Sequence, residues 1–80
     1  MKKANVLVID DDPAILELAR FHLTDEGYGV VTASTGIDGV VAANNQSFDL
    51  VLTDLNLPDI DGIELVRKLK GASPDVEIIM

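Results

Sequence analysis

The feature that most constrains the fold is an unbroken aliphatic run from Val6 to Ile9. A strand with one face in water alternates apolar and polar side chains, whereas a strand covered on both faces in a parallel sheet reads as a continuous apolar run. The run therefore predicts a central strand with other elements packed on both of its faces. Strand-like segments recur at 28–33, 50–53 and 76–80, where we expect the other strands.

Helical patterns separate these strands. Asp12 and Pro13 suit the N-cap and the first position of a helix that runs to Glu26 and stops before Gly27. The residues expected on its inward stripe are Ile15, Leu18, Ala19, His22 and Leu23. Such a stripe predicts a helix packed against the sheet.

The other two helices are predicted at 36–45 and 63–70. The former contains Gly39, a poor helix former, so tertiary packing has to sustain it. The latter is expected to turn Val66 and Leu69 inward. Strands that alternate with helices over short connections predict an α/β fold with a doubly wound parallel sheet.

Length and composition bound the rest. A chain of 80 residues has room for one small domain, predicted to occupy 1–80. The absence of cysteine excludes disulfides and thiolate metal sites, and a net charge of -8 argues against nucleic-acid binding by this segment. The apolar run after Lys2 and Lys3 is too short for a signal peptide or a membrane span, so we expect a cytoplasmic protein with no membrane partner.

Carboxylates follow two of the predicted strands. Asp10 and Asp11 leave the end of the first strand, and Asp54 leaves the end of the third. In open parallel sheets, ligands gather at the carboxyl ends of the strands, so these side chains are expected to meet in one crevice. Neighbouring carboxylates repel one another and call for a hard cation, Mg²⁺ or Mn²⁺, which in turn suggests phosphate chemistry with a carboxylate as nucleophile.

The sequence resembles the receiver domain of two-component response regulators. The resemblance is carried by VLVIDDDP, EGYGVVTASTG and DLVLTDLNLPDIDGIEL, and it covers the whole chain. It implies that Asp54 accepts a phosphoryl group from a histidine kinase, that Asp10 and Asp11 hold Mg²⁺ together with Asp54, and that the Asn56 backbone carbonyl is a further ligand. It also implies a flavodoxin-like strand order 2-1-3-4-5, of which the first four strands and three helices are expected in residues 1–80.

The chain departs from the family pattern at several points. Leu57 stands where methionine is commoner, and His22 occupies a helix position that is usually aliphatic. In the family, a Ser or Thr at the end of the fourth strand and a Lys at the end of the fifth contact the phosphoryl group, and the sequence stops at Met80 before either. The resemblance also implies that the phosphorylated state passes to an output domain or a partner protein outside this sequence. An exposed fourth-strand edge predicts a homo-oligomer.

Two alternatives stay open at this level. A haloacid-dehalogenase-like phosphatase also begins with an apolar strand and Asp-x-Asp, which Asp10 and Asp12 satisfy, and it would make Asp10 the nucleophile; Ala14 and the LNLPDIDG turn do not suit it. The other alternative is a truncated fragment that does not switch and acts only in assembly.

The remaining polar residues have plainer predicted roles. Asp12 is favoured as a helix cap over a metal ligand. Asp59 and Asp61 are predicted to be turn and cap residues of the third helix. His22, the sole histidine, is predicted to be a half-buried core residue.

Overall fold

The computed structural model describes residues 3–80. Strands and helices alternate along the chain in the order β1 (Asn5–Ile9), α1 (Pro13–Asp25), β2 (Gly29–Ala33), α2 (Gly36–Asn45), β3 (Leu50–Thr53), α3 (Gly62–Ala72) and β4 (Glu77–Ile79). Every predicted element is present. The third helix is longer at both ends than predicted, and the fourth strand is shorter.

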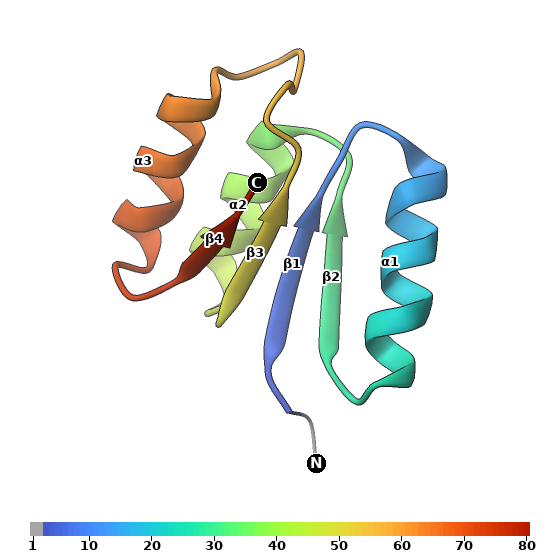
Figure 1. Ribbon diagram of the computed structural model, residues 1–80. Coiled ribbons are helices and arrows are strands. Elements are labelled where there is room, and N and C mark those ends of the chain that lie inside the picture. Colours follow the sequence, from blue (N-terminus) through green and yellow to red (C-terminus); the bar gives the residue numbers. More distant parts are fainter. Residues whose placement is uncertain (1–2) are drawn as a thin grey trace.

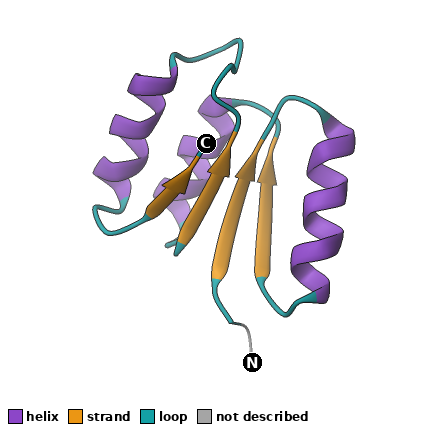
Figure 2. Ribbon diagram, viewed as in Figure 1, coloured by secondary structure: helices purple, strands orange, loops and turns teal. Residues whose placement is uncertain are grey.

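The strands form one parallel sheet in the order β2-β1-β3-β4 (Figures 1 and 2). This is the strand order expected of a flavodoxin-like sheet. Ile9, the last residue of β1, pairs with Ala33 of β2 and with Thr53 of β3. The carboxyl ends of these strands therefore lie side by side at one edge of the sheet.

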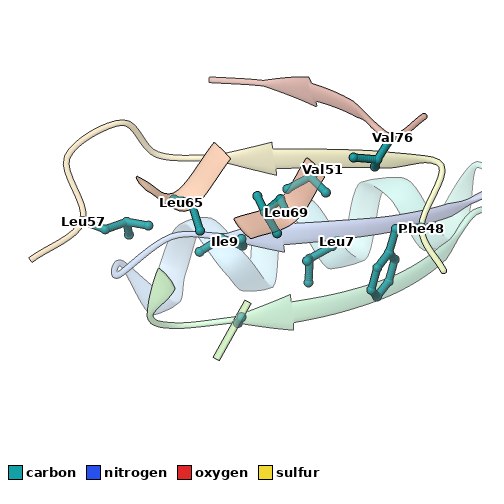
Figure 3. Packing of buried hydrophobic residues seen from close by; sticks show 9 residues of the cluster. Leu7, Ile9, Phe48, Val51, Leu57, Leu65, Leu69 and Val76 are labelled. Carbon is teal, nitrogen blue, oxygen red and sulfur yellow. The ribbon is translucent and has the colours of Figure 1, made fainter. Parts of the chain in front are cut away.

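Residues of β1 alternate between two separate apolar clusters. Leu7 and Ile9 pack with residues of α3 in the larger cluster, against which α2 also packs (Figure 3). Val6 and Val8 pack with Leu16 of α1 on the opposite face. The four apolar side chains of β1, Val6 to Ile9, are at most 4% exposed, so the prediction of a strand covered on both faces is confirmed.

The predicted inward stripe of α1 is partly wrong. Leu16 is the buried residue of α1, with Ala19 and Leu23 half-buried beside it, as expected for positions i, i+3 and i+7. Ile15 and Leu18, predicted inward, are 45% and 56% exposed. The stripe with Ile15 and Leu18 and the stripe with Leu16 and Leu23 are both apolar, so periodicity alone does not identify the inward one. The position of α1 against β1 and β2 determines which stripe is buried (Figure 1).

Two smaller predictions are corrected in the same way. His22 is exposed rather than half-buried, and its ring packs edge-on against Phe21 at 5.5 Å between centroids. In α3 the buried pair is Leu65 and Leu69, whereas Val66 is only half-buried. Leu65 and Leu69 lie one turn apart and point together into the larger cluster (Figure 3).

Within residues 3–80, no helix combines the length and the hydropathy that crossing a membrane would require.

Candidate functional site

The ends of β1 and β3 hold the candidate site in place through the backbone. The N–H of Asp54 donates to the carbonyl of Ile9 at 3.0 Å, and the N–H of Asp10 donates to the carbonyl of Ala33 at 3.1 Å. Each hydrogen bond extends the pairing of the sheet by one residue. Asp10 and Asp54 therefore leave neighbouring strands at the same level, as the sequence predicted.

Asp10, Asp11 and Asp54 form one acidic cluster. One carboxylate oxygen from each residue lies within 4.8 Å of the others. Asp10 and Asp54 are half-buried and Asp11 is exposed. Two unit charges at this separation repel by about 1 kcal/mol in bulk water and by about 3.5 kcal/mol at an effective dielectric constant near 20. The cluster therefore favours binding of a cation.

A short turn follows each of the two strands and fixes one carboxylate oxygen. Asp10 Oδ1 accepts the N–H of Asp12 at 2.9 Å, and Asp54 Oδ1 accepts the N–H of Asn56 at 3.2 Å. In the described part of the chain, Oδ2 of Asp10 and Oδ2 of Asp54 accept no hydrogen bond from the protein. Each turn thus orients a carboxylate and leaves its second oxygen available.

The acidic cluster has no basic partner in residues 3–80. The salt bridges there join Lys3 to Glu26, and Arg67 and Lys68 to Glu64. None of them reaches the strand ends. A donor set made of carboxylate oxygens, with no histidine or thiolate, suits a hard divalent ion such as Mg²⁺. The residues present therefore fit the predicted metal.

A cavity of about 360 Å³ opens beside the cluster. It is lined by Val8, Ile9, Asp10, Ile15, Leu52, Thr53, Asp54, Ile79 and Met80. The two aspartates lie among apolar side chains, of which Ile15, Ile79 and Met80 are about half exposed, so the cavity is open to solvent.

Three further aspartates near the site have structural roles. Asp12 caps α1 and accepts the N–H of Ala14 at 2.9 Å, as predicted. Asp61 occupies the N-cap of α3 but makes no capping hydrogen bond with its side chain. Asp59 lies in the bend before α3, as predicted, but its side chain does not serve that helix: its carboxylate accepts the N–H groups of Gly36 and Ile37 at the start of α2. No sequence pattern links residues 36 and 59.

Comparison with known proteins agrees with this geometry. The family of response regulator receiver domains matches residues 6–80. The transcriptional regulatory protein GlrR of Escherichia coli is 39% identical over 79 residues, which are 99% of this chain and 18% of GlrR. A CheY-like receiver domain from Methanospirillum hungatei has a TM-score of 0.91 at 39% identity, over 95% of this chain and 61% of that one.

A further solved structure is similar over the whole chain. It is the response regulator TrrA of Thermotoga maritima in complex with Mg²⁺ and BeF, with a TM-score of 0.86 at 35% identity. The match covers 100% of this chain and 68% of the TrrA chain. The present chain thus spans about a fifth of GlrR and about two thirds of these receiver structures.

A parallel sheet of order β2-β1-β3-β4, an acidic cluster at its carboxyl edge and the match over residues 6–80 define one class of protein. The chain belongs to the response regulator receiver domains of two-component signalling systems. Receiver domains are signalling phosphoacceptors.

Proposed function

We propose that Asp54 is the phosphoacceptor and that a histidine kinase supplies the phosphoryl group in a Mg²⁺-dependent reaction. The observation that carries this proposal is the free Oδ2 of Asp54, half-buried at a strand end with Asp10 and Asp11 within 4.8 Å. The similarity to TrrA supports it, because that protein is described in complex with the histidine kinase ThkA as well as with Mg²⁺ and BeF.

In the proposed transfer, Asp54 Oδ2 attacks the phosphorus atom of a phosphohistidine. A phosphorus–oxygen bond forms, the phosphorus–nitrogen bond breaks, and the imidazole leaves and takes up a proton. The hydrogen bond from the N–H of Asn56 holds Oδ1, so the carboxylate cannot rotate freely and Oδ2 keeps its direction. Such positioning accounts for much of the catalysis in phosphoryl transfer.

The metal would be held by Asp10, Asp11 and Asp54, with the Asn56 backbone carbonyl as a further ligand. A bound Mg²⁺ would neutralise charge that develops on the phosphoryl oxygens. Mn²⁺, which also prefers oxygen ligands, is the second candidate ion. Asp10 would contribute through Oδ2, since the N–H of Asp12 donates to its Oδ1 at 2.9 Å.

The phosphatase alternative, with Asp10 as the nucleophile, suits this geometry less well. It requires Asp12 to act as the acid or base next to Asp10. The Asp12 carboxylate instead caps α1 through the N–H of Ala14 at 2.9 Å. The turn after β3, which that alternative left unexplained, here carries the partner of Asp54.

The partners are proposed from the same comparisons. GlrR is named as a transcriptional regulator, so we propose that the phosphorylated state is read by an output domain or a partner protein. A net charge of -8 makes direct nucleic-acid binding by this segment unfavourable. The alternative of a fragment that acts only in assembly predicts no phosphorylation at all.

Phosphorylation followed by borohydride trapping tests the proposal. The protein is incubated with Mg²⁺ and acetyl phosphate, reduced, digested and analysed by mass spectrometry. We expect the label on Asp54, loss of labelling in Asp54→Asn, and no labelling when EDTA replaces Mg²⁺. A label on Asp10 would refute the assignment in favour of the phosphatase, and an absence of labelling would favour the assembly role.

A further inference from the structure

The loop between β3 and α3, residues 54–61, is held at both of its ends. At the near end, the N–H of Asp54 donates to the carbonyl of Ile9 at 3.0 Å. At the far end, Asp59 reaches across to another element: its Oδ1 accepts the N–H of Gly36 at 3.0 Å and its Oδ2 accepts the N–H of Ile37 at 2.8 Å. Asn56 lies between these two attachments.

The carboxylate of Asp59 completes the cap of α2. The N–H of Asp38, the next in line, donates to Thr35 Oγ1 at 3.0 Å, and the N–H of Gly39 makes the first bond within the helix, to the carbonyl of Thr35, at 3.0 Å. The first turn of a helix leaves its N–H groups without helical partners. Here Thr35 satisfies one of these groups and Asp59 satisfies two others, so a residue of the loop does the work of a local cap.

Close packing accompanies these hydrogen bonds. A Cβ atom at Gly36 would lie 2.2 Å from Ile60 Cγ2 and 3.3 Å from Leu57 Cδ1. Leu57 is 8% exposed and belongs to the larger apolar cluster, against which Ile60 also packs. The loop therefore approaches the start of α2 to a distance that only glycine at position 36 permits.

We propose that Asp59 is a positioning residue of the phosphoacceptor site: by binding the N–H groups of Gly36 and Ile37, it fixes the loop and thereby the Asn56 carbonyl relative to Asp10 and Asp11. This inference rests on the proposed function of Asp54. Asp59 is a latch between the loop and α2, because both of its carboxylate oxygens accept N–H groups of α2.

The protonation state of Asp59 suits this role. The pKa of its carboxyl lies below the ordinary value of 3.8, because the N–H of Ile37 and, to a smaller extent, the N–H of Gly36 stabilise the charged form against the cost of desolvation. The carboxylate is thus ionised at neutral pH and accepts both hydrogen bonds.

The test compares three variants of the protein with the wild type. Asp59→Ala removes the latch. Asp61→Ala removes the same charge from the same loop, where the side chain makes no capping hydrogen bond. Thr35→Ala removes the other side-chain cap of α2 and leaves Asp59 in place. Mg²⁺ binding is titrated by NMR in each protein, and the order parameters of the Leu55 and Asn56 amides are measured without metal.

We expect Asp59→Ala to weaken Mg²⁺ binding by about threefold to tenfold. The apparent dissociation constant rises because the loop is in its binding-competent conformation in a smaller fraction of the molecules. The order parameters at Leu55 and Asn56 should fall in this variant. Asp61→Ala should change Mg²⁺ affinity by less than about twofold, the effect of one screened charge. Thr35→Ala should lower thermal stability but leave the loop and the Mg²⁺ affinity unchanged.

The outcomes separate the two proposals. If the wild type binds Mg²⁺ and Asp59→Ala binds it equally well, or if Thr35→Ala weakens it as much, the latch is refuted and Asp59 is merely structural. If the wild type binds no Mg²⁺, the proposed function fails. The amide measurement then still decides the latch, since unchanged order at Leu55 and Asn56 in Asp59→Ala would exclude it. The milder Asp59→Asn serves if Asp59→Ala does not fold.

Discussion

Gly39 lies where α2 crosses the end of β1, and replacing it with alanine tests how closely that helix supports the site. A Cβ atom at this position would lie 2.3 Å from Ile9 Cδ1 and 2.8 Å from Ile9 Cγ1. Contacts this short require Ile9 to move. Ile9 is 1% exposed and packed on all sides, so it has little room to do so.

Two opposing effects set the size of the change in stability. Alanine in place of glycine inside a helix gains about 0.8 to 1 kcal/mol from backbone propensity. Overpacking a close-packed core costs about 1 to 3 kcal/mol. The overpacking dominates, and we expect Gly39→Ala to destabilise the protein by up to about 2 kcal/mol. Gly71→Ala is the matched control, because a Cβ there meets no atom within 4 Å.

Urea unfolding followed by circular dichroism measures both variants. Gly71→Ala should stabilise the protein by up to about 1 kcal/mol. Ile9→Val deletes Cδ1, the nearest atom, so the double variant Gly39→Ala/Ile9→Val should be about 0.5 to 1 kcal/mol more stable than additivity predicts. Rescue is partial, because the contact with Cγ1 at 2.8 Å remains. A Gly39→Ala protein as stable as Gly71→Ala would refute the reasoning.

Three further predictions concern charge and surface. Asp11→Ala should abolish Mg²⁺ binding in calorimetric titration, and unchanged binding would refute the metal assignment. The same variant should raise the stability of the metal-free protein, because it removes one of the mutually repelling carboxylates. The difference in free energy of unfolding between wild type and Asp59→Asn should be constant near neutral pH and shrink as pH falls below 3.8 through the lowered pKa of the folded protein. The reason is that Asp59 stabilises the fold only while its carboxyl is ionised. A difference that persists at the lowest pH would contradict this. A polypeptide of residues 1–80 should self-associate through β4, whose Ile79 is 53% exposed, and Ile79→Lys should prevent it; light scattering that shows a wild-type monomer at every concentration would disprove this edge pairing.

The elements and the acidic cluster could be predicted from the sequence because each depends on local pattern. The continuous apolar run of β1 required cover on both faces, and the parallel strands it implied brought Asp10 and Asp54 to one edge. The inward face of α1 could not be predicted, since the stripe with Ile15 and Leu18 and the stripe with Leu16 and Leu23 are both apolar. Only the placement of the helix over the sheet distinguishes them.

The role of Asp59 was beyond the sequence for a different reason. Asp59 precedes α3 in the chain, and local rules assign an aspartate in that position to the nearest helix. Its partners lie 22 and 23 residues away, and they become neighbours only when Gly36 lets the loop approach α2. Gly39 likewise has a role that local rules do not reveal. It is a poor helix former within α2, but its lack of a Cβ atom allows that helix to pack on Ile9.

Apolar packing therefore brings the three carboxylates of the acidic cluster together although they repel one another. Repulsion between Asp10, Asp11 and Asp54 opposes folding, whereas burial of Leu7, Ile9 and Val51 pins the strands that carry them. Burying a side chain of this size contributes about 1.5 to 3 kcal/mol, comparable to the repulsion of one carboxylate pair at an effective dielectric constant near 20. A bound cation relieves this repulsion, which favours the metal-bound state. The sheet holds the carboxylates close together, and this makes the metal-free site unfavourable but also keeps the carboxylate oxygens in position to bind the cation.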